Sequence, residues 1–245
     1  MTTLTQDPQL LETLNKMDAQ RLLSWGAEYH GKRAGIITSF QDTGCVMIDL
    51  AKKAGVDPRV LTIDTYRLHP ETYRLIEEVE KRYGIEVERF GATPEKVEEM
   101  VKDYGEYLFF DSKRMQEYCC HIRKVEPNEE ALKTLDVWYT GLRRDHSEGR
   151  KETPKASYVQ GPKMGQHILK IAPLADWTTE QVWDYIKEND LPYNDLYDQG
   201  YASIGCIICS TPIRPGEDKR AGRWRWFNDE NQGGGGDKEC GIHKS

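Results

Sequence analysis

Three short apolar segments, each followed by the spacing of an amphipathic helix, constrain the fold of this 245-residue chain more than any other feature. The first two are continuous apolar runs, as in strands that are buried on both faces of a parallel sheet, and the third alternates apolar and polar residues like a strand. Alternation of such strands with helices predicts an α/β protein with a doubly wound, mainly parallel sheet. The strand segments are Ala34–Ser39, Val60–Asp64 and Ile85–Phe90, and the helices after them end at Gly55, Gly84 and Tyr104.

Further elements flank these three units. Residues 7–30 predict a helical N-terminal arm in two pieces, the second of which is capped by Asp18. Thr178 and Gln181 have the spacing of a capping box, which predicts a helix through Ile186. Additional strands are predicted at Val137–Leu142 and Ile168–Ile171.

Residues 1–232 are interpreted as a single α/β domain, and residues 233–245 as a tail joined to it by Gly233–Gly236. Four consecutive glycines predict a flexible hinge and therefore a mobile tail. The tail carries Cys240 with His243 and two lysines nearby, and positive charge favours a thiolate over a thiol. From these residues alone, a frayed terminus and a mobile nucleophile both stay open as interpretations.

The net charge of −7 and the pI near 5.5 argue against a general nucleic-acid or membrane-surface binder. The first thirty residues hold no apolar leader, and nowhere do eighteen apolar residues run together. We therefore expect a cytoplasmic protein whose partner is a small molecule. In that reducing compartment, cysteines are expected to bind metal or to do chemistry instead of forming disulfides.

Four of the six cysteines form two tight pairs, which match a four-thiolate metal site. The pairs are Cys119–Cys120 and the CxxC pair of Cys206 and Cys209. Structural zinc usually takes two knuckles in which spaced cysteines wrap the ion, and adjacent cysteines do not form such a knuckle. The pattern favours an iron–sulfur cluster, with zinc as the alternative. Cys45 has no such companion and is interpreted as a core or loop cysteine.

Polar loops follow three of the predicted strands, where ligands bind in doubly wound sheets. Backbone N–H groups of a Ser/Gly loop at a helix N-terminus suit phosphate or sulfate, although the same residues also make ordinary turns. No Walker lysine or GxGxxG motif is present. The three loops are Ser39–Gly44, Asp64–His69 and Gly141–Asp145.

Basic residues gather near the cysteine pairs although the chain as a whole is acidic. Arginine offers a planar fork to phosphate-like oxygens and lysine offers a point charge, so the mixture suits a doubly charged anionic ester. A solvated run of charges is the alternative interpretation. The residues are Arg123, Lys124, Arg143, Arg144, Arg214, Lys219, Arg220 and Arg223.

Six segments taken together resemble the assimilatory adenylyl-sulfate and phosphoadenylyl-sulfate reductases, in a match that covers nearly the whole chain from Ser39. The resemblance implies a fold of the adenine nucleotide alpha hydrolase type. The two cysteine pairs resemble the branch of the family that carries a [4Fe-4S] cluster and reduces adenosine 5′-phosphosulfate. The segments are Asp64–Thr72, Cys119–Lys124, Thr140–Asp145, Gly205–Cys209, Arg220–Trp224 and Lys238–His243.

The resemblance implies an oxidoreductase of sulfate assimilation and cysteine biosynthesis, in which Cys240 attacks the substrate sulfur. The products would be an S-sulfocysteine and AMP, and thioredoxin would then release sulfite. It implies cluster ligation by Cys119, Cys120, Cys206 and Cys209, and catalytic roles for Cys240, Lys124 and His243. It implies substrate binding by Ser39, Phe40, Thr65, Arg67, Arg123, Arg143, Arg144, Arg220 and Arg223. A homo-oligomer stays open.

Two loops depart from the family pattern. The family's Ser-Phe-Ser-Gly-Ala-Glu-Asp is replaced by Ser39–Cys45, of which Ser39 and Phe40 match. The family's Leu-Asp-Thr-Gly is replaced by Ile63–Tyr66, so that Tyr66 stands where a glycine lets the backbone approach the ligand. Two alternatives to the adenylyl-sulfate reductase stay open. They are a reductase of the 3′-phosphorylated substrate and a nucleotide-binding module with structural zinc.

Overall fold

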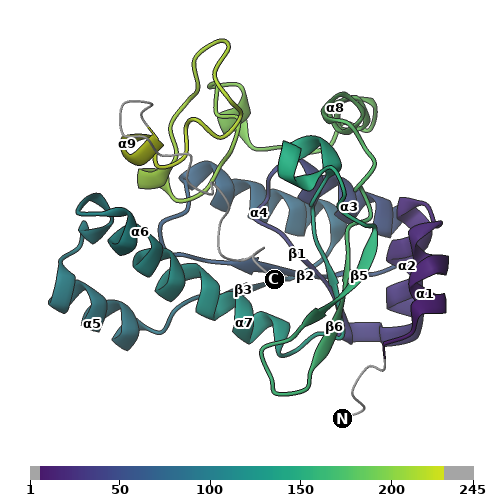
Figure 1. The fold of residues 1–245 in the computed structure, drawn as a ribbon. Helices are drawn as coiled ribbons and strands as arrows, with labels where there is room; N and C mark the ends of the chain where they lie inside the picture. The colour runs from purple at the N-terminus through teal and green to yellow at the C-terminus, as the bar shows by residue number, and fades with distance from the viewer. Residues whose placement is uncertain (1–5, 229–245) are drawn as a thin grey trace. The chain divides into compact units, whose positions relative to one another are not determined.

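The computed structural model describes residues 6–228 and contains a six-stranded sheet with the order β3-β2-β1-β4-β6-β5 (Figure 1). Strand β1 pairs in parallel with β2 and with β4, and β4 pairs in parallel with β6. Strand β5 pairs with β6 in the antiparallel sense. The strands are β1 Ala34–Ile37, β2 Arg59–Ile63, β3 Val87–Phe90, β4 Val137–Tyr139, β5 Ala156–Gln160 and β6 His167–Ile171. The predicted mainly parallel α/β fold is thus confirmed.

Two helices begin at the caps that the sequence predicts. The Asp18 side chain accepts a hydrogen bond from Arg21 N at the start of α2, and the predicted capping box of Thr178 and Gln181 forms at the start of α8. The helices are α1 Pro8–Asn15, α2 Ala19–His30, α3 Asp42–Lys53, α4 Pro70–Tyr83, α5 Pro94–Tyr104, α6 Lys113–Cys120, α7 Glu126–Leu132, α8 Thr179–Glu188 and α9 Arg225–Asn228.

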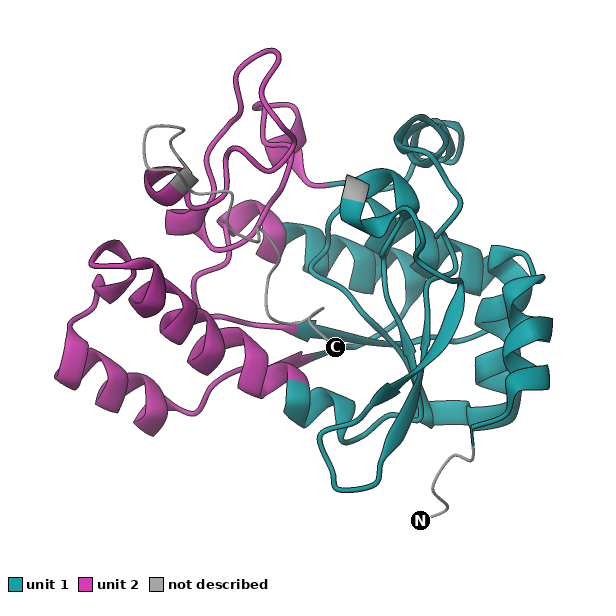
Figure 2. Ribbon diagram, in the orientation of Figure 1, with its two compact units in different colours: residues 1–62, 74–88, 129–193 teal, residues 63–73, 89–128, 194–245 magenta. Residues whose placement is uncertain are grey.

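The chain divides into two compact units (Figure 2). Unit 1 comprises residues 1–62, 74–88 and 129–193, and unit 2 comprises residues 63–73, 89–128 and 194–245. Each unit has a hydrophobic core of its own. Among the described residues, the core of unit 1 is built by α2, α3, α8 and the central strands, and includes Ile36, Met47 and Leu169. The core of unit 2 includes Met100, Phe109 and Cys119.

The strands differ from the predicted segments mainly at their ends. Strand β1 stops at Ile37 and β4 stops at Tyr139, so that polar residues predicted to continue each strand belong to loops instead. Strand β5 was not predicted from the sequence. Its residues Ala156–Gln160 are mostly half-exposed at the edge of the sheet, and an edge strand lacks the continuous apolar run that marks a buried one. No helix among the described residues is long and apolar enough to cross a membrane.

A helical segment between Lys113 and Leu132 was also not predicted. Helix α6 continues directly into a π-helical turn at His121–Val125, and α7 follows without a break. The Glu126 N–H bonds to the carbonyl of His121, five residues back, which is the spacing of a π-helix. Such turns recur at functional sites, and this one lies directly after Cys119 and Cys120.

One ion pair of unit 1 joins the residues that precede β1 and β4. Arg33 Nε and Nη2 donate to the two carboxylate oxygens of Asp136 at 2.8 and 2.6 Å, and the Asp136 N–H donates to Arg33 O. The imidazole of His30 lies 3.6 Å from the same carboxylate. Burial acts to raise the pKa of Asp136, but the hydrogen bonds and charge of Arg33 outweigh it and hold that pKa below its usual value.

We predict that Asp136→Asn lowers the free energy of unfolding by about 1 kcal/mol at pH 7. Because the folded-state pKa is lowered, this contribution is present above the unfolded pKa and is lost as the pH falls through the folded one. Urea titrations at pH 7 and at lower pH should therefore show the difference between variant and wild type shrinking with acid. Glu12→Gln, which removes an exposed pair with Lys16, is the matched control and should change little at either pH. A difference that stays constant with pH would contradict the prediction.

Candidate functional site

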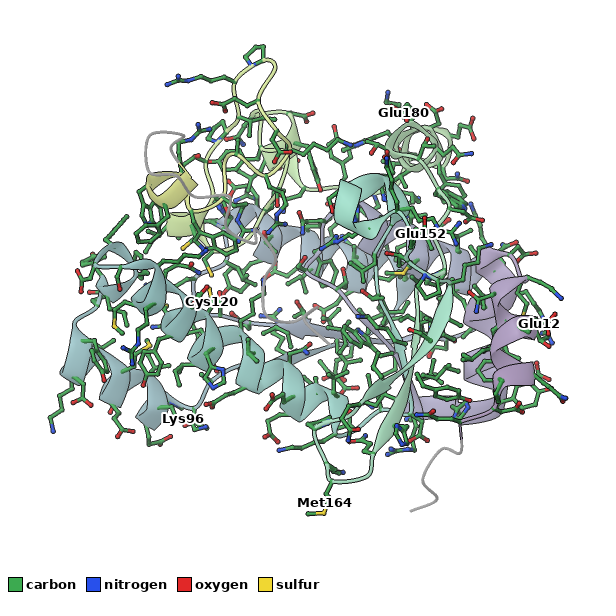
Figure 3. All side chains as sticks on the ribbon, viewed as in Figure 1. Glu12, Lys96, Cys120, Glu152, Met164 and Glu180 are labelled. Carbon is green, nitrogen blue, oxygen red and sulfur yellow. The ribbon has the colours of Figure 1, made fainter. Side chains whose placement is uncertain are left out.

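The four paired cysteines all lie in unit 2. Cys119 and Cys120 end α6, where Cys120 is labelled in Figure 3. Cys206 directly precedes the tight turn of residues 207–209, and Cys209 ends it. None of the four forms a disulfide with another described cysteine. Cys119 and Cys209 are buried, whereas Cys120 and Cys206 are partly exposed. The structure thus brings into one unit two cysteine pairs that are 86 residues apart in the sequence, counting from Cys120 to Cys206.

The thiols of the two segments are electrostatic neighbours. Burial, together with the charge of Cys206, raises the pKa of the Cys209 thiol to about 12. Burial also raises the pKa of Cys119, against the lowering effects of Arg123 and Arg67. In the part of the chain that the structure describes, no group of three or more Cys, His, Asp or Glu side chains is arranged to hold a metal ion.

The loop after β2 is bound to both cysteine segments. Arg123 Nη1 donates to Thr65 O at 3.0 Å, which joins this loop to the π-helical turn after Cys120. The Cys206 thiol donates to Thr65 Oγ1 at 3.2 Å. The N–H of Ile207 donates to Arg67 O at 2.8 Å. Residues 65–67 are therefore held from two sides.

Three predicted arginines lie around these thiols. Arg123 is 6% exposed, and its buried Nε has no hydrogen-bond partner among the described residues. Arg67 lies over the ring of Phe109 at 5.2 Å. Arg223 Nε donates to Cys209 O at 3.1 Å, and a Cβ at Gly205 would lie 2.3 Å from the Arg223 guanidinium. Gly205 is therefore required by the close approach of that arginine.

Two further predicted residues of unit 2 are partly accessible. Lys124 lies in the π-helical turn next to Arg123 and is half-buried. Arg220 lies over the ring of Trp224 at 5.9 Å. Both side chains are thus only partly exposed. The predicted catalytic residues Cys240 and His243 lie outside the described residues.

In unit 1, the loops after β1 and β4 approach each other at the point where the strand order reverses. A Cβ at Gly141 would lie 2.3 Å from Thr43 Oγ1, and a Cβ at Gly44 would lie 2.0 Å from Thr38 Oγ1. Ser39 is exposed in this region. Ligands of open α/β sheets bind outside such a switch point, so the geometry supports a ligand site at these loops.

The predicted substrate-binding residues of unit 1 differ sharply in burial. Phe40 is fully buried and packs in the core. Arg144 is exposed and donates from Nε to Thr153 O. Arg143 is 2% exposed and is paired with Asp42 at 3.3 Å and with Asp145 at 3.6 Å. Through these contacts Arg143 stabilises the structure of unit 1.

Sequence reasoning did not single out Asp64 or His69. Asp64 is buried, and its Oδ1 accepts hydrogen bonds from Tyr66 N and from the hydroxyl of Tyr73, both at 2.8 Å. His69 is 4% exposed, its ring meets the edge of Tyr201, and burial lowers its pKa. The sequence contained a signal for the turn at Asp64. An aspartate carboxylate often accepts the backbone N–H of the residue two positions later in a turn.

Residues 34–212 match the family described as the phosphoadenosine phosphosulfate reductase domain, and the chain belongs to this family. Relatives named adenosine 5′-phosphosulfate reductase include those of Neisseria meningitidis, with 42% identity over 81% of this chain and 78% of the relative. That of Allochromatium vinosum has 40% identity over 84% of this chain and 77% of the relative. That of Burkholderia cepacia has 38% identity over 96% and 89%.

The solved structures agree with this assignment. The phosphoadenylyl-sulfate reductase from Candida auris is similar with a TM-score of 0.70 and 28% identity, over 86% of this chain and 100% of that one. The FMN adenylyltransferase of Candida glabrata is similar with a TM-score of 0.55 and 12% identity, over 85% and 69%. The second likeness shows a shared fold alone.

The two carboxylates paired with Arg143 suggest a test of its contribution to stability. We predict that Arg143→Met lowers the free energy of unfolding by about 3 kcal/mol, because Asp42 would lose the cation that compensates its burial. Chemical denaturation measures the loss. Arg144→Met removes the exposed neighbouring arginine and should change stability by about 0.5 kcal/mol or less. Equal losses in the two variants would contradict the prediction.

Proposed function

We propose that this protein reduces adenosine 5′-phosphosulfate to sulfite and AMP, with a thioredoxin-type dithiol protein as reductant. The observation that carries the proposal is the gathering of both cysteine pairs in unit 2, around a loop flanked by Arg67 and Arg123. The curated relatives, named adenosine 5′-phosphosulfate reductases, support the choice of substrate. The terminal segment Lys238–His243 supplies the proposed nucleophile, Cys240.

The donor set fits a [4Fe-4S] cluster in its chemistry. Four thiols lie in one unit, and the buried Arg123 Nε has no acceptor among the described residues, which an anionic group beside it would provide. In a cluster the thiolates bind different iron atoms, so they need not converge on one ion as zinc ligands do. Cys119, Cys120, Cys206 and Cys209 would hold it. Bound there, a cluster would add fixed charge and order to the site.

The main role that we assign to the described residues is to supply positive charge to the anionic substrate. The phosphosulfate is an anion, and charge develops on the departing phosphate when the bond to sulfur breaks. We assign the binding of this anion to Arg67 and Lys124, and Arg123 donates to Thr65 O in the loop that carries Arg67. Arg220 and Arg223 would contribute from the segment after Cys209. Ser39 and Arg144 are the exposed candidates in unit 1.

The reaction divides into two displacements at sulfur. In the first, the Cys240 thiolate attacks the sulfur of the phosphosulfate. A sulfur–sulfur bond forms, the bond from sulfur to the bridging oxygen breaks, and AMP leaves with its electron pair. The enzyme then carries an S-sulfonate on Cys240. Positively charged neighbours such as His243 would lower the pKa of the attacking thiol.

The second displacement consumes the reductant. A thioredoxin thiolate attacks Sγ of Cys240, the sulfur–sulfur bond breaks, and sulfite leaves with the electron pair. The second thioredoxin thiol resolves the mixed disulfide and restores Cys240. Two electrons thus pass from the dithiol to the sulfur, and the two thiol protons go to solvent.

A reductase of 3′-phosphoadenosine 5′-phosphosulfate is the second candidate. The description of the family and the name of the solved Candida auris protein favour it. The chemistry at sulfur would be the same, and only the contacts to the ribose would differ. Comparing kcat/KM for the two nucleotides with the same dithiol protein separates the candidates.

We predict that Cys240→Ser abolishes the covalent intermediate. Incubation of the wild type with adenosine 5′-phosphosulfate, without reductant, should add one sulfonate group to the peptide that contains Cys240, and mass spectrometry detects it. The serine variant should gain none, because a hydroxyl is not an adequate nucleophile here. Cys45→Ala, which changes a fully buried core cysteine, is the matched control and should form the adduct. A sulfonate on the Cys240→Ser protein would overturn the proposed nucleophile.

We predict that protein purified without oxygen contains iron and acid-labile sulfide. Cys206→Ser should lose most of the iron because it removes one of four thiolates, while Cys45→Ala should retain it. Metal analysis and the absorption spectrum measure the outcome. Colourless protein with one zinc per chain, or iron that survives Cys206→Ser, would contradict the ligand assignment without bearing on Cys240.

A further inference from the structure

Tyr66 has a backbone conformation that residues with side chains rarely adopt. Its φ is +56°, in the left-handed region that favours glycine, and for a bulky residue this is a genuine outlier. The family pattern has a glycine at this position, as the sequence comparison indicated. A tyrosine held in a glycine conformation is strained, and strained residues gather at ligand-binding and switch segments.

The neighbours of Tyr66 stabilise this conformation. Its N–H donates to Oδ1 of the buried Asp64, which also accepts from the Tyr73 hydroxyl. The residue before it, Thr65, is bonded to Arg123 and to Cys206. The backbone at Thr65 and Tyr66 is thus fixed by hydrogen bonds with Asp64, Arg123 and Cys206.

The loop after β1 provides an internal comparison. Phe40 is the third residue after β1, as Tyr66 is after β2, and has a φ of +53°. Its N–H donates to Thr38 Oγ1 in the same manner. Phe40, however, is 0% exposed and packs in the core, whereas Tyr66 is 57% exposed. Core packing therefore explains the aromatic ring at position 40 but not the one at position 66.

The Tyr66 ring is nevertheless positioned. A Cβ at Gly91 would lie 2.6 Å from the Tyr66 phenol oxygen, so the tip of the ring lies against the segment after β3. The φ of Gly91 is not in the left-handed region, so it is the approach of neighbouring atoms that leaves no room for a side chain there. An aromatic ring that is anchored at its tip and exposed over most of its surface is suited to stack on a flat ligand group.

We propose that Tyr66 is a substrate-positioning residue on which the adenine base stacks, while cations such as Arg67 bind the phosphosulfate. The inference deepens the proposed function and rests on it. Tyrosine loses little conformational freedom on binding, and the strained backbone fixes the direction of its Cβ. In this chain a ring contact takes the place of the close backbone approach that glycine permits in the family pattern.

The test compares Tyr66→Asn with Tyr66→Phe in the full-length protein, using AMP and ribose 5-phosphate as probes. Asparagine tolerates the left-handed conformation, so it removes the ring with little change to the backbone. We expect Tyr66→Asn to weaken AMP binding about tenfold and to leave ribose 5-phosphate binding unchanged. Tyr66→Phe should bind both as the wild type does. Isothermal titration calorimetry measures the affinities of the wild type and both variants for the two probes.

Tyr29→Asn is the matched control, because Tyr29 is 61% exposed in unit 1 and should leave AMP binding unchanged. Equal affinity of wild type and Tyr66→Asn for AMP would overturn the stacking proposal while leaving the proposed function intact. Equal weakening of both probes, or a loss in Tyr66→Phe as large as in Tyr66→Asn, would also overturn it. Wild-type protein that neither binds AMP nor reduces adenosine 5′-phosphosulfate would overturn the proposed function itself.

Discussion

The buried guanidinium of Arg123 is the interaction on which the arrangement of unit 2 depends. It donates to Thr65 O on the loop after β2, and its charge acts to lower the pKa of the nearby Cys119 thiol. A buried cation is stable only with partners, and removing one of them leaves charge uncompensated. The position of this loop and the position of the first cysteine pair are therefore linked through one side chain. Cys206 adds a second link to the same residue, Thr65.

The helix that carries Arg123 has a local geometry suited to this linkage. Arg123 follows Cys119 by four residues, and its charge acts to lower the pKa of the Cys119 thiol. The π-helical turn begins at His121 and inserts an extra residue before α7. It therefore changes the direction in which side chains after Cys120 point relative to a regular α-helix. The cysteine pair and the cations at positions 123 and 124 consequently lie next to each other along one short segment.

Some features of this arrangement could be predicted from the sequence, and others could not. The buried strands and their helices were predicted because apolar periodicity is a local signal. Gathering of the cysteine pairs was predicted because paired thiols are distinctive by residue type. The π-helical turn has no local signature, and the partners of Arg143 could not be inferred because Asp42 is remote in the chain. The edge strand β5 was missed because only Ala156 of its residues is fully buried.

Phe40 and Tyr66 have the same left-handed backbone conformation, but its energetic cost is offset in different ways. Each such conformation costs about 1–3 kcal/mol. At Phe40, burial of a whole aromatic ring offsets a cost of this size, since it contributes roughly 1.5–3 kcal/mol. At Tyr66, more than half of the side chain stays exposed, and the offset must come mainly from the hydrogen bonds of Asp64 and Thr65. Those bonds would form equally well with glycine at position 66. Stability of the fold therefore does not account for the tyrosine, whereas the proposed stacking of a ligand on its ring would.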